Sequence, residues 1–331
     1  MALTLSLLDL AIVGRDETVA ESLAACVTVA RRAEELGYRR VWYAEHHNMA
    51  AIASSATAVL IAHVAAHTSS IRLGSGGIML PNHSPLTIAE QFGTLEALHP
   101  GRIDLGLGRA PGTDQVTVRA LRRDPRAAET FPQDVVELQA FLADESVVPG
   151  VEATPGKGTR VPLYILGSSL FGAELAGALG LPYAFASHFA PQALTEAIDR
   201  YRRSFRPSAQ LDAPYAIAGV NVIAADTDAE AQEQLQITRR ARVRRMFTVH
   251  GRPVTDEEAD AILRGPQAAA IDQMLQYTAV GTADVVGTFL GRFATDVGVD
   301  ELMTVHQAST LAGRLRSLEL TAEAVGATQP A

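Results

Sequence analysis

The sequence predicts one α/β domain, a (β/α)8 TIM barrel over residues 1–325, followed by a flexible tail at 326–331. Short apolar runs alternate with segments of helical periodicity, which is typical of parallel strands joined by helices. About eight such runs occur, the number that closes a barrel. Most runs are continuously apolar, as expected when both faces of a parallel sheet are covered. A doubly wound open sheet shares this alternation and is the alternative.

The first strand and helix set a pattern that the rest of the chain repeats. The apolar start of the chain contains Asp9 and has no basic leader, so we expect a buried strand and not a targeting segment. Thr18 and Glu21 have capping-box spacing, and Gly37 ends the helix that they begin. The predicted strands cover residues 3–8, 41–44, 71–80, 103–108, 163–166, 183–186, 217–224 and 301–305.

Two segments are longer than a strand, a helix and their short connections require. Residues 109–126 form a long loop rich in Arg, Asp, Pro and Gly, and residues 246–281 form an insertion, a lid before the last strand. Loops of this size in a compact domain usually cover or build a binding site. A helix over residues 51–66 is rich in Ala and Ser, which lets another helix approach closely.

Composition and charge limit the function classes. The chain has 28 Lys and Arg against 37 Asp and Glu, a net charge of −9, which disfavours nucleic acids and anionic membrane surfaces. The longest weakly charged stretch is interrupted by polar residues, so no membrane span is expected. The single cysteine, Cys26, has helical spacing to apolar neighbours and indicates a core thiol in the reducing cytoplasm.

Polar residues are concentrated directly after the predicted strands, where the active sites of barrels lie. Five of the nine histidines follow strand ends, which predicts that they converge on one face. Taken singly, each histidine could instead satisfy a local backbone group. The strand-end residues are Glu45, His46, His47, Asn48, Asn82, His83, Arg109, Ser168, Ser169, His188 and His306.

A second pattern predicts a phosphate site. Arg109 follows Gly106 and Gly108, where the missing side chains allow a ligand close to the backbone. Ser168 and Ser169 end a strand and open a helix, whose free N–H groups attract anions. Capping of that helix by one serine is the alternative. GLGRAP at 106–111 and GVEATPGKG at 150–158 match neither the dinucleotide-binding nor the P-loop fingerprint.

Several segments together resemble the bacterial luciferase-like, flavin-dependent monooxygenases. The similarity covers most of the chain, and the combination of motifs is specific although each piece alone is not. The matching segments are VWYAEHHN at 41–48, IRLGSGGIMLPNHSPL at 71–86, AEQFGTLEALHPGRIDLGLGRAPGTD at 89–114, LYILGSS at 163–169, LGLPYAFASHF at 179–189 and DELMTVHQ at 300–307.

The resemblance implies flavin mononucleotide (FMN) lying across the strand ends, reduced by NAD(P)H on this chain or through a flavin reductase, and used with O2 on a small organic substrate. It also implies a homodimer formed through residues 51–66, and a mobile lid at 246–281. Light emission is not carried over, because Ser168 stands where luciferase has an acidic residue. No metal is expected.

The resemblance implies a role for each site residue. His46 matches a histidine that transfers protons beside the flavin ring, and His47 is assigned with it. Gly76 and Gly77 match a cis peptide packed against that ring. The remaining assignments are Glu45, Arg109, Ser168 and Ser169 to the cofactor, and His83, His188 and His306 to the substrate pocket.

Two other classes stay open. A metal-dependent hydrolase would use Asp9, Glu45, His46, His47 and His306. Adjacent histidines in a strand point to opposite sides, so His46 and His47 would not easily share one ion. A deazaflavin-dependent oxidoreductase, or a flavin-binding subunit without catalysis, would carry the same motifs.

Overall fold

Eight parallel strands close into a barrel in the computed structural model, which describes residues 3–144, 146–249 and 252–326. The first strand pairs with both the second and the last, and the sixth pairs with the seventh, so each of the eight strands has two neighbours in a closed ring, which excludes the open sheet. Of the expected tail only Gly326 lies within the described residues. The strands are β1 (Leu5–Asp9), β2 (Arg40–Tyr43), β3 (Arg72–Met79), β4 (Ile103–Gly108), β5 (Leu163–Gly167), β6 (Tyr183–Phe185), β7 (Ala216–Ala224) and β11 (Glu301–His306).

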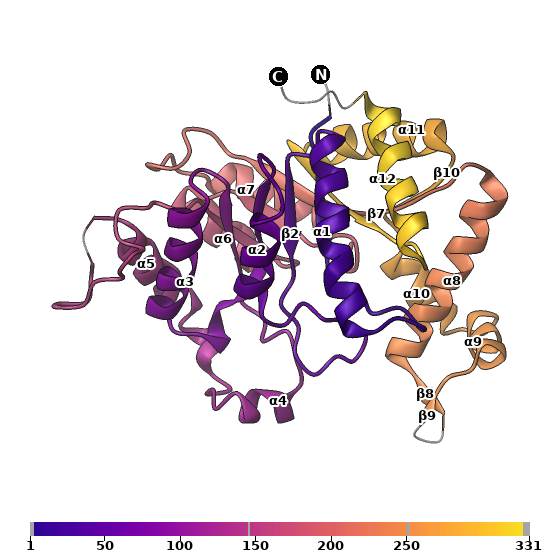
Figure 1. Cartoon of the computed structure of the whole chain (residues 1–331), viewed down its shortest axis with the longest axis horizontal. Coiled ribbons are helices and arrows are strands. Elements are labelled where there is room, and N and C mark those ends of the chain that lie inside the picture. The colour runs from indigo at the N-terminus through magenta and orange to yellow at the C-terminus, as the bar shows by residue number, and fades with distance from the viewer. Residues whose placement is uncertain (1–2, 145, 250–251, 327–331) are drawn as a thin grey trace.

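Helices surround the barrel and cover its outer face (Figure 1). The capping box of Thr18 and Glu21 is confirmed at the first helix. No helix within the described ranges is both long and apolar enough to cross a membrane. The helices are α1 (Val19–Glu35), α2 (Thr57–Ala65), α3 (Pro85–Leu98), α4 (Gln115–Ala120), α5 (Phe131–Leu142), α6 (Leu170–Leu179), α7 (Leu194–Ser204), α8 (Asp228–Met246), α9 (Asp256–Leu263), α10 (Ala268–Met274), α11 (Ala283–Val297) and α12 (Leu311–Val325).

Alternation along each strand separates an inner core from an outer one. The inner core fills the barrel, and among its members are Leu8, Trp42 and Val305. The larger outer core lies between the strands and the helices. It includes Leu7, Val41 and other strand residues that alternate with those of the inner core. Continuously apolar strands follow from this arrangement, because both of their faces are buried.

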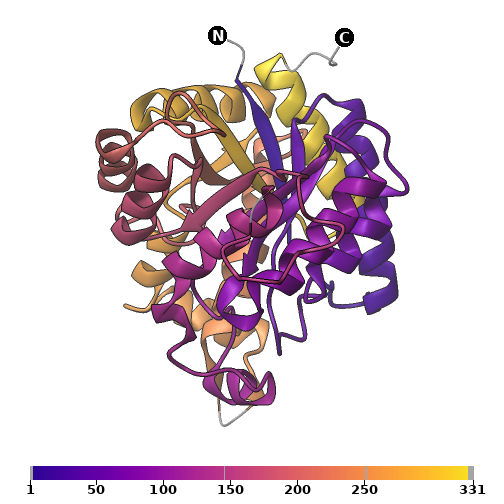
Figure 2. The same ribbon diagram turned by 90° about the vertical axis from the view of Figure 1, so that its left-hand side faces the viewer.

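The two long segments have more regular structure than the sequence predicts. The loop at 109–126 contains α4, and the insertion at 246–281 contains a hairpin of β8 (Thr248–Val249) and β9 (Arg252–Pro253), then α9, α10 and β10 (Thr278–Gly281). Both α4 and the hairpin project from the end of the barrel at which the strands finish, the lower end in Figures 1 and 2.

The strand β10 is a feature that the sequence prediction missed. It is parallel to the second half of β7, from Asn221 to Ala224, whereas β6 pairs with the first half of β7. The insertion is therefore attached to the barrel through the sheet. The helix expected over residues 51–66 is also shorter, because α2 begins only at Thr57 and the preceding residues form turns and a bridge.

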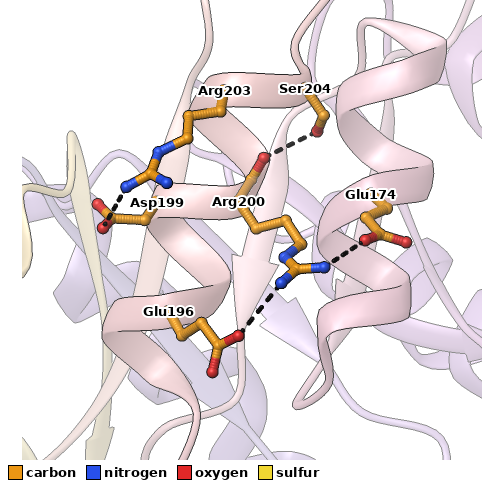
Figure 3. Close-up of a pocket in the computed structure, with 6 residues that line it drawn as sticks. All are labelled: Glu174, Glu196, Asp199, Arg200, Arg203 and Ser204. Carbon is orange, nitrogen blue, oxygen red and sulfur yellow. Dashed lines mark hydrogen bonds and ion pairs between the residues drawn. The ribbon is translucent and has the colours of Figure 1, made fainter.

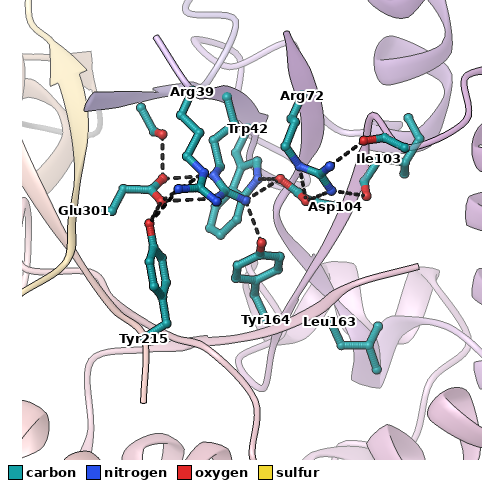
Figure 4. Close-up of polar contacts among 12 residues, drawn as sticks. Arg39, Trp42, Arg72, Ile103, Asp104, Leu163, Tyr164, Tyr215 and Glu301 are labelled. Carbon is teal, nitrogen blue, oxygen red and sulfur yellow. Dashed lines mark hydrogen bonds and ion pairs between the residues drawn. The ribbon is translucent and has the colours of Figure 1, made fainter. Parts of the chain in front are cut away.

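Buried charges fill the opposite end of the barrel, where the strands begin (Figure 4). Arg40 lies between two carboxylates, with Asp104 at 2.6 Å and Glu301 at 2.9 Å. Trp42 donates a hydrogen bond to Asp104, and the Tyr164 hydroxyl lies 2.7 Å from Arg40. All three charged groups are almost completely buried, and each has partners of opposite charge.

Candidate functional site

Glu45 anchors two of the predicted site histidines at the end of β2. Its buried carboxylate accepts hydrogen bonds from His47 at 2.9 Å, His83 at 2.9 Å, Asn82 at 3.2 Å and the Met79 N–H at 3.0 Å. Burial opposes ionisation of Glu45, yet the hydrogen bonds from His47 and His83 lower its pKa to about 2. Glu45 therefore positions histidines, and both of its oxygens are occupied by protein groups.

The two adjacent histidines are oriented differently, as the sequence predicts. His47 turns back to Glu45, and that hydrogen bond raises the pKa of His47. The His46 side chain keeps a buried Nδ1 without a hydrogen-bond partner. Burial and the positive charge of Arg245 lower the pKa of His46, so that its imidazole is neutral at pH 7. His46 is thus the one of the pair available to bind a ligand or move a proton.

His188 lies after β6 and faces the same space. Its Nδ1 is also buried and unpartnered, and burial, together with Arg242 and His46, lowers its pKa to about 3. Gly219 of β7 makes room for the ring, because a Cβ there would lie 2.3 Å from Nδ1 of His188. Asn221 fixes the loop by donating to the His188 carbonyl at 2.6 Å. His46 and His188 therefore lie close enough to interact electrostatically at the barrel mouth.

The glycine pair in the second half of β3, where the pairing with β4 shifts register, is confirmed as a cis peptide, Gly76–Gly77. A Cβ on Gly76 would lie 2.7 Å from Leu8, and a Cβ on Gly77 would lie 2.7 Å from the Gly106 carbonyl. Neither position has space for a side chain. The backbone of Gly76 remains partly accessible, whereas Gly77 is buried.

A separate cationic group follows β4 and β5. The Arg109 guanidinium lies 4.3 Å above the ring of Phe171, in the first turn of α6. Ser169 is the N-cap of α6 but its hydroxyl makes no capping hydrogen bond, and Ser168 and Ser169 are both exposed. The capping alternative is therefore not realised. Arg109 and the free N–H groups of α6 can together hold an anion.

His306 lies away from this group, contrary to its assignment to the substrate pocket. Strand β11 extends to His306, so alternation places its side chain on the outer face while Val305 faces the barrel interior. Ser317 of α12 lies 2.8 Å from its Nδ1, and Thr304 lies 3.2 Å from its Nε2. The predicted strand ended one residue too early, and this error assigned His306 to the wrong face.

The residues of the hydrolase alternative are also dispersed. Asp9 pairs with Arg314 of α12, and Glu45 is occupied by His47 and His83. Within the described part of the chain, no three His, Cys, Asp or Glu side chains are placed to share a metal ion. The alternative of a metal-dependent hydrolase thus gains no support.

Sequence reasoning missed Arg242 and Arg245 near the end of α8. Their charges act on His188 and His46 respectively, which places both arginines at the barrel mouth. The available signal was the run RRARVRR at 239–245, which contains no acidic residue. Such a run on a polar helix is ordinarily a solvated face.

Comparison with known proteins identifies the family. The family model for luciferase-like monooxygenases matches residues 5–301. The chain belongs to the luciferase-like monooxygenase family. A luciferase-like monooxygenase of Escherichia coli (strain K12) is 45% identical over 317 residues, 95% of each chain. The N-acetyl-S-alkylcysteine monooxygenase of Bacillus subtilis (strain 168) is 33% identical and covers 97% of this chain and 98% of its own.

Solved structures agree with the luciferase-like fold. The crystal structure of apo-MsnO8 has a TM-score of 0.89 and 38% identity, covering 98% of this chain and 99% of its own. More distant members share the fold at 16–17% identity. They include the oxygenating constituent of 3,6-diketocamphane monooxygenase in complex with FMN, with a TM-score of 0.74, and an F420-dependent secondary alcohol dehydrogenase, with a TM-score of 0.72. Of these two distant structures, the first contains FMN and the second contains an F420 adduct.

Proposed function

We propose that the protein is an FMN-dependent monooxygenase that uses reduced flavin and O2 to oxidise a small organic substrate. One observation carries the proposal: the neutral, unpartnered His46 lies at the same end of the barrel as a free cationic site at Arg109 and α6. A flavin mononucleotide needs both a polar group beside its ring and a phosphate site. The name of the N-acetyl-S-alkylcysteine relative supports a small organic substrate.

The residues present fit the cofactor at both of its ends. Arg109 has no carboxylate partner among the described residues, and its guanidinium is fixed over Phe171. A phosphate placed there would accept hydrogen bonds from Arg109, from the Ser168 and Ser169 hydroxyls, and from the first N–H groups of α6. The backbone of Gly76, which lacks a side chain, allows close approach of a planar ring to β3.

When bound, reduced FMN supplies the two electrons with which one atom of O2 enters the substrate and the other leaves as water. The protein contributes placement and proton transfer. His46 holds or moves a proton at Nδ1, because that nitrogen has no protein partner. Glu45 keeps His47 and His83 in fixed orientations. Apolar side chains of the barrel interior, Leu8 and Val305 among them, exclude water from below the site.

Flavin titration tests the proposal. We expect FMN to bind with a visible change in its absorbance, and to bind more tightly than riboflavin, which lacks the phosphate. Arg109→Gln should weaken FMN binding by about 10- to 100-fold, since a charge-assisted hydrogen bond contributes about 1.5–3 kcal/mol, and should leave riboflavin binding unchanged. Arg203→Gln is the matched control, because Arg203 is an exposed arginine of α7. Failure of the wild type to bind any flavin would contradict the proposal.

The same titration with a deazaflavin distinguishes the proposed FMN enzyme from a deazaflavin-dependent oxidoreductase. Tighter binding of the deazaflavin than of FMN would favour the latter. Oxygen uptake with NAD(P)H, with and without an added flavin reductase, then shows whether reduction occurs on this chain. We propose a cytoplasmic reaction, since NAD(P)H is available there. A protein that binds FMN yet leaves O2 consumption unchanged would be the non-catalytic subunit.

We propose a homodimer formed through α2. Its outer face carries Val59, which is 70% exposed, among small residues that permit close approach of a second helix. Light scattering during size-exclusion chromatography should give about twice the chain mass of 35.1 kDa. Val59→Arg should shift the protein toward the monomer, and a wild-type mass equal to one chain would reject this assembly.

A further inference from the structure

The last two turns of α8 carry five arginines, and three of these have acidic partners. These three ion pairs connect α8 to helices α9 and α10 of the insertion. Each of the three arginines is therefore matched by a carboxylate. The pairs are Arg239 with Asp272 at 2.8 Å, Arg240 with Asp260 at 2.7 Å, and Arg244 with Asp256.

The other two arginines, Arg242 and Arg245, have no such partners. They are three residues apart, so they share one face of the helix. No carboxylate of a described residue pairs with either of them, although other arginines of the same helix find partners nearby. Arg242 is half-buried, and burial together with the charge of Arg245 lowers its pKa to about 10. Arg245 itself is exposed, so one half-buried and one exposed guanidinium lie near each other without a carboxylate partner among the described residues.

The end of α8 lies beside the barrel mouth, because Asp256, the partner of Arg244, is also 4.0 Å from Arg15 in the loop that follows β1. The charge of Arg242 acts on His188, and that of Arg245 acts on His46. Each of these imidazoles has a buried Nδ1 without a partner. The nearby acid, Glu45, is already occupied by His47 and His83. The mouth therefore combines two unpaired guanidinium groups with two unpaired ring nitrogens, an arrangement that favours a bound anion.

A surface hollow between α6 and α7 contains two arginines that, unlike Arg242 and Arg245, are paired with carboxylates (Figure 3). Arg200 there bridges Glu174 at 2.7 Å and Glu196 at 3.3 Å, and Arg203 pairs with Asp199 at 3.4 Å. Its charges are matched and exposed, so this hollow does not require a ligand. The hollow and the end of α8 differ in whether their arginines have acidic partners, and not in how many arginines they contain.

We propose that Arg242 and Arg245 bind the anionic group of an organic-acid substrate, a carboxylate in the first instance, at the barrel mouth above His46 and His188. This inference rests on the proposed monooxygenase function and specifies its substrate class. The planar guanidinium fork matches a carboxylate with two parallel hydrogen bonds. The FMN phosphate is the other anion that the site could receive, but Arg109 and α6 provide a separate site for it.

Matched acids and amides test the proposal on the FMN-loaded protein. Octanoate and 3-phenylpropanoate are each compared with the corresponding primary amide by calorimetry, because each pair differs in charge while keeping nearly the same shape. We expect the acids to bind at least about tenfold more tightly, and Arg242→Gln/Arg245→Gln to remove this preference. Arg239→Gln, which removes an arginine of the same helix that is already paired with Asp272, should keep it. Equal binding of acid and amide, no binding of either acid at millimolar concentration, or an unchanged preference in the double variant would overturn the proposal.

Flavin affinities separate this inference from the function on which it rests. The double variant should still prefer FMN over riboflavin, whereas Arg109→Gln should not. If the double variant loses that preference, the two arginines bind the cofactor phosphate, so the substrate assignment fails while the monooxygenase proposal stands. If the wild type binds no flavin, the monooxygenase proposal fails, and the acid–amide comparison on the flavin-free protein still tests the arginine site.

Discussion

The two ends of this barrel differ in how their charged side chains are paired. Where the strands begin, the buried Arg40 forms ion pairs with Asp104 and Glu301, and one of its N–H groups donates to the Tyr164 hydroxyl (Figure 4). Where the strands finish, the charges of Arg242 and Arg245 have no acidic partner within the described residues.

The difference shows which end of the barrel is built for stability. A buried charge that is matched by opposite charges holds strands together and leaves no unpaired charge to attract a ligand. Unpaired groups such as His46 Nδ1 are costly in a folded protein unless a ligand satisfies them. The mouth is therefore the end at which chemistry is expected, in agreement with the position of active sites in TIM barrels.

The largest expected effect is on proton transfer at the mouth. His46→Asn should slow the single-turnover reoxidation of bound, reduced FMN by about 10²–10⁴-fold, the usual contribution of a positioned acid or base. Its free energy of unfolding should change by less than about 1 kcal/mol, because His46 Nδ1 has no partner to lose. Stopped-flow absorbance and urea denaturation measure the two quantities. His99→Asn, at the other end of the barrel, is the control, and an unchanged reoxidation rate in H46N would remove His46 from the mechanism.

The opposite pattern is expected at the other end. Arg40→Met should lower the free energy of unfolding by about 3–5 kcal/mol, because it leaves Asp104 and Glu301 buried without their shared partner. The affinity of the folded protein for FMN should be unaffected. Chemical denaturation checks the first result and flavin titration the second. Arg203→Met provides the exposed-arginine control, with a loss below about 1 kcal/mol; a similarly small loss in R40M would contradict the comparison.

A smaller effect is expected from filling the space beside His188. In Gly219→Ala the new Cβ would lie 2.3 Å from the imidazole, so the ring must move. Overpacking of this kind costs about 1–3 kcal/mol of stability, and the moved ring should also alter carboxylate binding. Gly291→Ala is a useful comparison, because a Cβ there would meet no atom within 4 Å. Equal acid affinities in G219A and the wild type would show that His188 does not shape the anion site.

A further effect depends on pH and develops only below about pH 6.5. Burial lowers the pKa of His306 to about 3 in the folded chain, from an ordinary value of 6.5. Between these two values the unfolded chain binds more protons, so the free energy of unfolding falls as the pH decreases from about 6.5 toward 3. His306→Gln should make this slope shallower, by up to about 1.4 kcal/mol per pH unit, whatever its effect on stability at neutral pH. Denaturation curves across this range measure the slope, and an unchanged slope would exclude His306 as a contributor.

Local patterns in the sequence predicted most of the scaffold and part of the site. Apolar runs located all eight barrel strands, because burial on both faces leaves a continuous signal. The EHH motif and the Gly76–Gly77 pair were located correctly. The roles of these residues were not predicted correctly, because Glu45 orients the nearby His47 and also His83, which is 38 residues away in the sequence.

The sequence alone determined the barrel, the family and the loops from which the mouth is built, since these depend on periodicity and on short motifs. Only the tertiary structure decided which charges are matched. Arg242 and Arg239 are the same residue type one turn apart on one helix, and they differ because another segment brings Asp272 to Arg239 and no described carboxylate to Arg242. His306 was misassigned for a related reason, because one residue of strand length determines the face on which a side chain lies.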